Sequence, residues 1–120
     1  MSHTPGIRAS AKDVSIRDFK PFWSYVVGAG RASEGLRADW QRQLKQASLA
    51  CGFRYVRFHG LYHDDMNVYH ETEGVVTYNF QYIDTLFDAL LEMNVRPFVE
   101  LGLCPALLAT NKEDVVSVVI

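Results

Sequence analysis

The chain has 120 residues, 48% of them hydrophobic, and a formal net charge of −2 at pH 7. This length suffices for one small domain with its own hydrophobic core. A slightly acidic chain lacks the basic surface that binds nucleic acid or an anionic membrane. The sequence also contains no run of about 18 apolar residues that would predict a membrane span. We therefore expect neither a nucleic-acid partner nor a membrane partner.

The two cysteines, Cys51 and Cys104, lie far apart and do not form a metal-binding pair. The N-terminus lacks the basic start and apolar run of a signal peptide. We therefore expect reduced thiols, no cofactor and a cytoplasmic location.

The first part of the chain changes character at Pro21. Residues 1–20 mix serine, proline, glycine and alternating charges without periodicity, which predicts an N-terminal arm. Residues 22–28 are rich in aromatic and β-branched side chains, which predicts a buried strand. The strand is expected to end in a turn at Gly28-Ala29-Gly30.

Two amphipathic helices are predicted, each followed at once by a strand. Ser33 is expected to cap the first helix and Gly52 to end it, because apolar residues recur at helical spacing between them. Asn79 and Asn94 are expected to do the same for the second helix. The strands after the helices are predicted at residues 53–58 and 96–101.

The order strand, helix, strand, helix, strand predicts an α/β fold with a parallel sheet, either open or closed as a barrel. The polar loop at residues 59–77 is long for such a fold, and long loops after parallel strands tend to carry the functional site. We therefore expect the functional residues between His59 and Tyr69.

The last ten residues differ from the rest of the chain. Residues 111–120 end in an apolar run without a stop signal. We expect residues 21–110 to form the domain, and residues 111–120 to be an atypical tail that arose by truncation or a frameshift.

The turn at residues 28–33 invites comparison with a dinucleotide-binding turn, because it follows a strand and opens a helix. Ser33 replaces the third glycine of that pattern, and the next strand ends in Arg57 and His59 where an acidic residue is needed. The sequence favours an ordinary strand-to-helix turn.

A divalent metal site is the second alternative, because imidazole and carboxylate groups together suit zinc, iron or manganese. The candidate ligands are His59, His63, Asp64, Asp65 and His70. Two histidines four residues apart need a helix to share a face, and Gly60 disfavours a helix start there. We therefore expect hydrogen-bonding groups and no metal.

Arg57 and His59 are predicted to share one face of their strand, which in a barrel would be the interior. A buried arginine needs a carboxylate partner, and Glu100 on the next strand is the natural candidate. The pair either satisfies only itself or orders the site. His59, at the strand end, is expected to contact a ligand.

Paired carboxylates are the usual groups for hydrolysing a glycosidic bond. The carboxylates near the predicted site are Glu100, Asp64, Asp65, Glu71 and Glu73. None of them forms a convincing catalytic pair in the sequence.

Several motifs nevertheless occur in the order typical of one enzyme family. They are Arg57-Phe58-His59-Gly60, Asp64-Asp65-Met66, Tyr78-Asn79-Phe80-Gln81-Tyr82-Ile83-Asp84 and Arg96-Pro97-Phe98-Val99-Glu100-Leu101. Together with Gly28-Ala29-Gly30 and Leu36-Arg37-Ala38-Asp39, they resemble the N-terminal part of glycoside hydrolase family 39, which includes β-xylosidases and α-L-iduronidases. The resemblance spans residues 22–109 and is closer to the xylosidase branch.

The resemblance implies a (β/α)8 TIM barrel, of which this chain would supply roughly the first three strands and two helices. It also implies a retaining mechanism with one catalytic glutamate after the fourth strand and another on the seventh, both beyond the chain end. The residues expected to bind the substrate are His59, Gly60, His63, Asp64 and Asp65. Those expected to support the site are Arg57 and Glu100.

The resulting hypothesis is a β-xylosidase-like glycoside hydrolase that acts on a xyloside or related carbohydrate, with the isolated chain inactive. An exposed sheet edge would also favour self-association. The alternative is a non-catalytic α/β module that binds a sugar or serves as an interaction surface.

Overall fold

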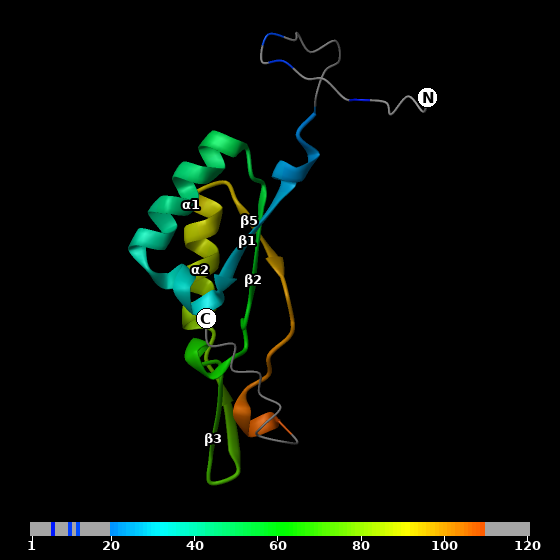
Figure 1. The fold of residues 1–120 in the computed structure, drawn as a ribbon. Coiled ribbons are helices and arrows are strands. Elements are labelled where there is room, and N and C mark those ends of the chain that lie inside the picture. The colour runs from blue at the N-terminus through cyan, green and yellow to red at the C-terminus, as the bar shows by residue number, and fades with distance from the viewer. Residues whose placement is uncertain (1–5, 7–9, 11, 13–19, 110–120) are drawn as a thin grey trace, which may run out of the picture.

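A computed structural model describes residues 6, 10, 12 and 20–109 (Figure 1). Most of the predicted N-terminal arm and all of the predicted tail at residues 111–120 lie outside the described residues. Within residues 20–109, neither α-helix has the length and apolar character needed to cross a membrane.

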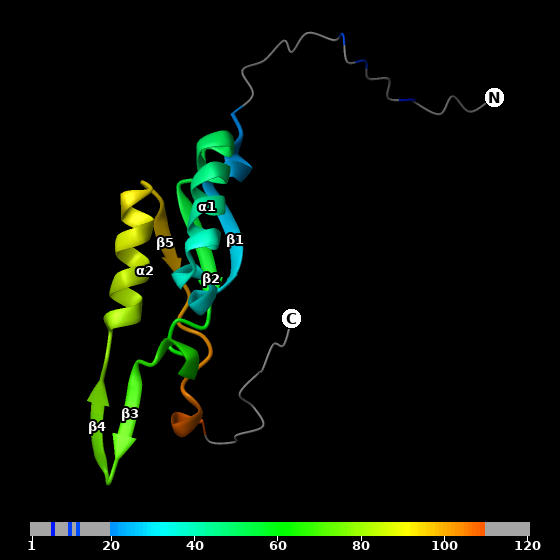
Figure 2. The same ribbon diagram turned by 90° about the vertical axis from the view of Figure 1, so that its left-hand side faces the viewer.

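A three-stranded parallel sheet forms the centre of the fold, in the order β1-β2-β5. The elements around it are β1 (Val26–Arg31), α1 (Ala38–Cys51), β2 (Tyr55–His59), α2 (Gln81–Glu92) and β5 (Arg96–Val99). Both helices cover the same face of the sheet (Figures 1 and 2). The predicted α/β class and the parallel crossovers are therefore confirmed.

The first strand lies further along the chain than predicted. Residues Phe22–Tyr25 form a 3-10 turn, and β1 begins at Val26 and includes the glycines that were predicted to form a turn. Pairing with β2 continues to the end of β1, where Arg31 lies opposite His59 after a register shift. The strand therefore delivers Arg31 to the edge of the sheet.

The start of the first helix was predicted wrongly. Ser33 lies in a short 3-10 helix, Ala32–Leu36, and α1 begins only at Ala38. The predicted ends of both helices are confirmed: Gly52 has a left-handed φ of 75°, and Asn94 one of 58°. A left-handed residue ends a helix because it turns the chain away from the helical path.

The start of the second helix agrees better with the prediction. The Asn79 side chain accepts a hydrogen bond of 3.0 Å from the backbone N–H of Gln81. This bond satisfies one of the free donors in the first turn of α2.

The predicted polar loop contains regular structure. Its elements are a 3-10 helix, Asp64–Met66, and an antiparallel hairpin of β3 (Tyr69–Thr72) and β4 (Val75–Tyr78). The hairpin extends away from the sheet and helices (Figure 2). Strands of four residues are too short to give a clear alternating pattern, which is why the sequence did not reveal them.

The hydrophobic core lies between the sheet and the helices. Val56 and Phe58 of β2 point toward the helices and are buried. They belong to one cluster with the buried residues Leu44, Ile83, Leu86 and Leu90. The other face of β2 carries Tyr55, Arg57 and His59, because successive side chains of a strand point to opposite sides.

The core assignment predicts different effects for two neighbouring leucines of α2. Leu90 is 0% exposed and Leu91 is 56% exposed. Leu90→Ala should lower the free energy of unfolding by about 2–5 kcal/mol, because it leaves a cavity in the core. Leu91→Ala should change it by no more than about 0.5 kcal/mol. Urea unfolding of both variants tests the assignment, and equal losses would contradict it.

Candidate functional site

The carboxyl ends of the three parallel strands lie at one edge of the sheet. Arg31 ends β1, His59 ends β2 and Glu100 follows β5 directly. Arg31 lies opposite His59 in the strand register. Ligands of α/β sheets bind at this edge, so these residues mark the candidate site.

The predicted partnership of Arg57 and Glu100 is present as an ion pair, with Arg57 Nη2 2.5 Å from Glu100 Oε2. Glu100 Oε2 has no hydrogen-bond partner among the described residues, so this contact is an ion pair alone. The Arg57 side chain is 52% exposed, so the prediction that it is buried is wrong for this part of the chain. The reason is that no described element covers this face of the sheet.

His59 has an unused hydrogen-bonding group. Its Nε2 atom is buried and has no hydrogen-bond partner within residues 20–109, although the ring as a whole is only partly buried. A buried polar atom without a partner costs about 1–3 kcal/mol, so native proteins usually provide one. Arg31 Nε and Glu100 Oε2 are likewise buried without a hydrogen-bond partner among the described residues, so three such atoms belong to residues at the ends of the three strands.

Gly60 contributes through its backbone. It adopts a left-handed φ of 74°, and its carbonyl accepts a hydrogen bond of 3.2 Å from the His63 N–H. Residues other than glycine rarely adopt this backbone conformation, which explains why a glycine directly follows the strand. The tight turn brings the following loop back over the strand ends.

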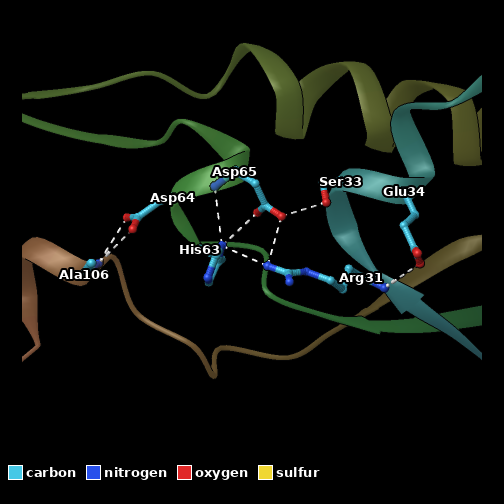
Figure 3. A network of polar contacts seen from close by, with 7 residues as sticks. All are labelled: Arg31, Ser33, Glu34, His63, Asp64, Asp65 and Ala106. Carbon is cyan, nitrogen blue, oxygen red and sulfur yellow. Dashed lines mark hydrogen bonds and ion pairs between the residues drawn. The ribbon is translucent and has the colours of Figure 1, made fainter. Parts of the chain in front are cut away.

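A polar network holds that loop against β1 (Figure 3). Asp65 forms an ion pair of 3.0 Å with Arg31 and accepts a 2.8 Å hydrogen bond from the Ser33 hydroxyl. The backbone N–H of Arg31 donates to Glu34 Oε2 at 3.1 Å. Sequence reasoning missed Arg31 and Ser33 because it placed both in a turn, and the strand register that brings them to the site could not be read from the sequence.

His63 also belongs to this network. Its Nδ1 atom lies 2.9 Å from Arg31 Nη2 and 3.1 Å from Asp65 Oδ1. The imidazole ring therefore lies beside both members of the Arg31–Asp65 ion pair.

Asp64 connects two loops that follow different strands. Its carboxylate accepts hydrogen bonds from the Ala106 N–H, at 3.1 Å to Oδ1 and 3.4 Å to Oδ2. Ala106 begins the short 3-10 helix Ala106–Leu108, in the segment after β5 (Figure 3). This contact therefore fixes the loop after β2 relative to the loop after β5.

The remaining candidates lie on the hairpin, away from the site edge. His70 Nε2 contacts the Asn67 carbonyl at 3.1 Å, and the Tyr69 hydroxyl donates to Glu71 at 3.0 Å. That hydrogen bond to the Glu71 carboxylate raises the pKa of Tyr69 above its usual value. Glu73 occupies the hairpin turn with a φ of 53°.

The carboxylates of Asp64, Asp65, Glu71 and Glu100 each have a partner within the chain. In the part of the chain that the structure describes, no three histidine, cysteine or acidic side chains are grouped to hold a metal ion.

Comparison with known sequences places this architecture in a family. The sequence profile of "Glycosyl hydrolases family 39" matches residues 7–117, so the match reaches into both the predicted arm and the predicted tail. The chain is 41% identical over 95 residues to a β-xylosidase of Caldicellulosiruptor saccharolyticus and 42% identical over 101 residues to one of Geobacillus stearothermophilus. These matches cover 78% and 81% of the chain but 20% of each relative, so the chain spans about a fifth of their length.

Solved structures agree with the sequence comparison. A GH39 enzyme from Xanthomonas axonopodis pv. citri is 39% identical with a TM-score of 0.70, over 73% of this chain and 17% of that enzyme. A GH39 β-xylosidase from Caulobacter crescentus is 36% identical with a TM-score of 0.71, over 76% of this chain and 20% of that enzyme. The chain therefore belongs to glycosyl hydrolase family 39.

Proposed function

We propose that this chain is the N-terminal part of a (β/α)8 barrel in a β-xylosidase-like glycoside hydrolase. Family membership and the β-xylosidase relatives support this assignment. The order β1-β2-β5, with both helices on one face, matches the start of such a barrel. The natural substrate would be a xyloside or a related glycoside.

The observation that carries the proposal is that His59 Nε2, at the carboxyl edge of the sheet, has no hydrogen-bond partner among residues 20–109. Active sites of (β/α)8 barrels lie at this edge, and a sugar hydroxyl would supply the missing hydrogen bond. Gly60 would keep the backbone clear beside the bound sugar. Arg57 and Glu100, on the same side of the sheet, would order the floor of the site.

His63, Asp64 and Asp65 would serve the site mainly by holding its loops in place. Each has a partner within the chain, so contact with a sugar would compete with an existing interaction. We propose that Arg31 and Ser33 fix Asp65, and that Asp64 fixes the loop after β5. Together they would set the width of the sugar-binding cleft.

The catalytic glutamates of a retaining mechanism would come from outside these 120 residues, after the fourth strand and on the seventh. Retaining enzymes need two carboxyl groups about 5–5.5 Å apart on either side of the scissile bond. Asp64, Asp65 and Glu100 are each engaged within the chain, which supports the proposal that the catalytic carboxyl pair lies outside this segment. The same observation favours the second candidate function, a sugar-binding module without catalysis.

The uncovered sheet also supports a proposal about association. Within the described residues, β1 and β5 are edge strands, and Phe98 of β5 is 54% exposed. Open edges with apolar side chains pair readily with other chains. We propose that the isolated chain self-associates through this edge.

The proposed function leads to a prediction about catalysis. The purified 120-residue chain should show no hydrolysis of an aryl β-xyloside above the rate of buffer, because residues 20–109 bring no free carboxylate pair to the site edge. Release of the aryl group, followed by absorbance, is the measurement. Turnover that co-purifies with the chain and disappears in a Glu100→Gln variant would contradict the prediction.

The proposed function also leads to a prediction about sugar binding. His59→Ala should weaken xylose binding by about two- to tenfold, which corresponds to the loss of one hydrogen bond. The matched control is His70→Ala, because His70 lies on the hairpin and should leave the affinity unchanged. Titration of both variants, followed by NMR, makes the comparison. Equal affinity of the His59 variant and the unmodified chain would remove His59 from the site.

A further inference from the structure

The amino ends of the three parallel strands lie at the end of the sheet opposite the candidate site (Figure 2). Two hollows of about 370 Å³ and 480 Å³ lie there. The smaller hollow is lined by Arg54, Tyr55, Asn94 and Arg96. The charged side chains of the larger hollow are Lys20 and Arg54. Because Arg54 lines both hollows, they adjoin each other.

The lining of these hollows is basic, although the chain as a whole has a net charge of −2. Neither hollow is lined by an aspartate or a glutamate, whereas Lys20, Arg54 and Arg96 supply three positive charges. The C-terminal ends of α1 and α2 point toward this end of the sheet (Figure 2). Each helix end carries only about half a negative charge, so the three cations outweigh both ends. The hollows therefore favour an anion.

The backbone and one aromatic ring hold the two arginines in place. The Arg96 N–H donates a 2.9 Å hydrogen bond to the Arg54 carbonyl, so the two residues are neighbours across the strands. The Arg54 guanidinium carbon lies 4.9 Å from the centre of the Tyr25 ring. Such a cation–π contact orients a guanidinium group without neutralising its charge.

Arg54 and Arg96 also differ from the arginines that pair with carboxylates. Arg31, Arg37 and Arg57 each form an ion pair within the chain. Neither Arg54 nor Arg96 has a carboxylate partner among residues 20–109. A guanidinium group presents its N–H donors in a planar fork that matches the oxygens of a phosphate group. Two adjacent arginines without carboxylate partners therefore suit an anion with several oxygens.

We propose that the smaller hollow binds a phosphate group, either free or as part of a phosphate ester. Arg54 and Arg96 donate to its oxygens, and the Asn94 amide is a neutral donor at the same hollow. A phosphate ester carries about −1.5 to −2 charges at pH 7, so it gains more from two guanidinium groups than a singly charged carboxylate does. Because this hollow and His59 lie at opposite ends of the sheet, phosphate and a sugar bind without competing.

Equilibrium dialysis of the 120-residue chain against radiolabelled inorganic phosphate tests the proposal. One phosphate should bind per chain. Arg54→Gln and Arg96→Gln should each weaken binding about tenfold, because each removes a charged hydrogen-bond donor. Both side chains are exposed, so both variants should keep the fold, which far-UV circular dichroism checks.

The matched control is Arg42→Gln, which removes the same charge elsewhere. Arg42 is also exposed, but it lines a hollow on the helices that includes Glu92. Its substitution should leave the phosphate affinity unchanged. Equal weakening by Arg42→Gln and Arg96→Gln would mean that phosphate responds only to the overall charge, which overturns the proposal. Chloride that competes as well as unlabelled phosphate at equal concentration would overturn it too.

Phenyl phosphate distinguishes a phosphate ester from the free anion. Phe22 and Tyr25 line the larger hollow, so the ring of an ester can pack beside them. If phenyl phosphate binds more tightly than inorganic phosphate and Arg96→Gln weakens both, the site takes an ester. Equal affinities, both weakened by Arg96→Gln, assign the site to the free anion. If Arg96→Gln leaves the binding of phenyl phosphate unchanged, the ring alone is bound and the proposal fails.

Discussion

The parallel pairing of β2 with both β1 and β5 is the constraint on which the candidate site depends. It brings Arg31 opposite His59, and it places Glu100 one residue beyond the last pair of β2 and β5. Residues far apart in the sequence therefore meet at one edge. Polar contacts then fix the loops there, with Asp65 held by β1 and Asp64 bonded to the segment after β5.

One face of the sheet is covered by the two helices, and the other face is exposed. The helix-covered face buries Val56 and Phe58, whereas Arg57 and Phe98 on the other face are about half exposed. In a closed (β/α)8 barrel the second face would be the packed interior. The chain spans about a fifth of the length of its β-xylosidase relatives, and in the proposed barrel the remaining strands would cover these side chains.

The elements with clear periodicity or end signals could be predicted from the sequence. Gly52 and Asn94 ended the helices as expected, and β2 and β5 lay within one or two residues of their predicted positions. The hairpin and the role of Arg31 could not be predicted in this way. Short strands leave no periodic signal, and the contact of Arg31 with Asp65 depends on strand register and a three-dimensional turn. The pairing of Arg57 with Glu100 could be predicted from the need of a buried arginine for a carboxylate partner, although the Arg57 side chain is 52% exposed.

The central claim is that the carboxyl edge of this sheet receives the sugar, with His59 as a direct contact. A crystal structure of the chain with bound xylose tests that claim most directly. The account predicts a sugar hydroxyl within hydrogen-bonding distance of His59 Nε2, about 2.7–3.2 Å, between the loops after β2 and β5. Xylose bound elsewhere on the molecule, or an empty edge at saturating xylose, would contradict it.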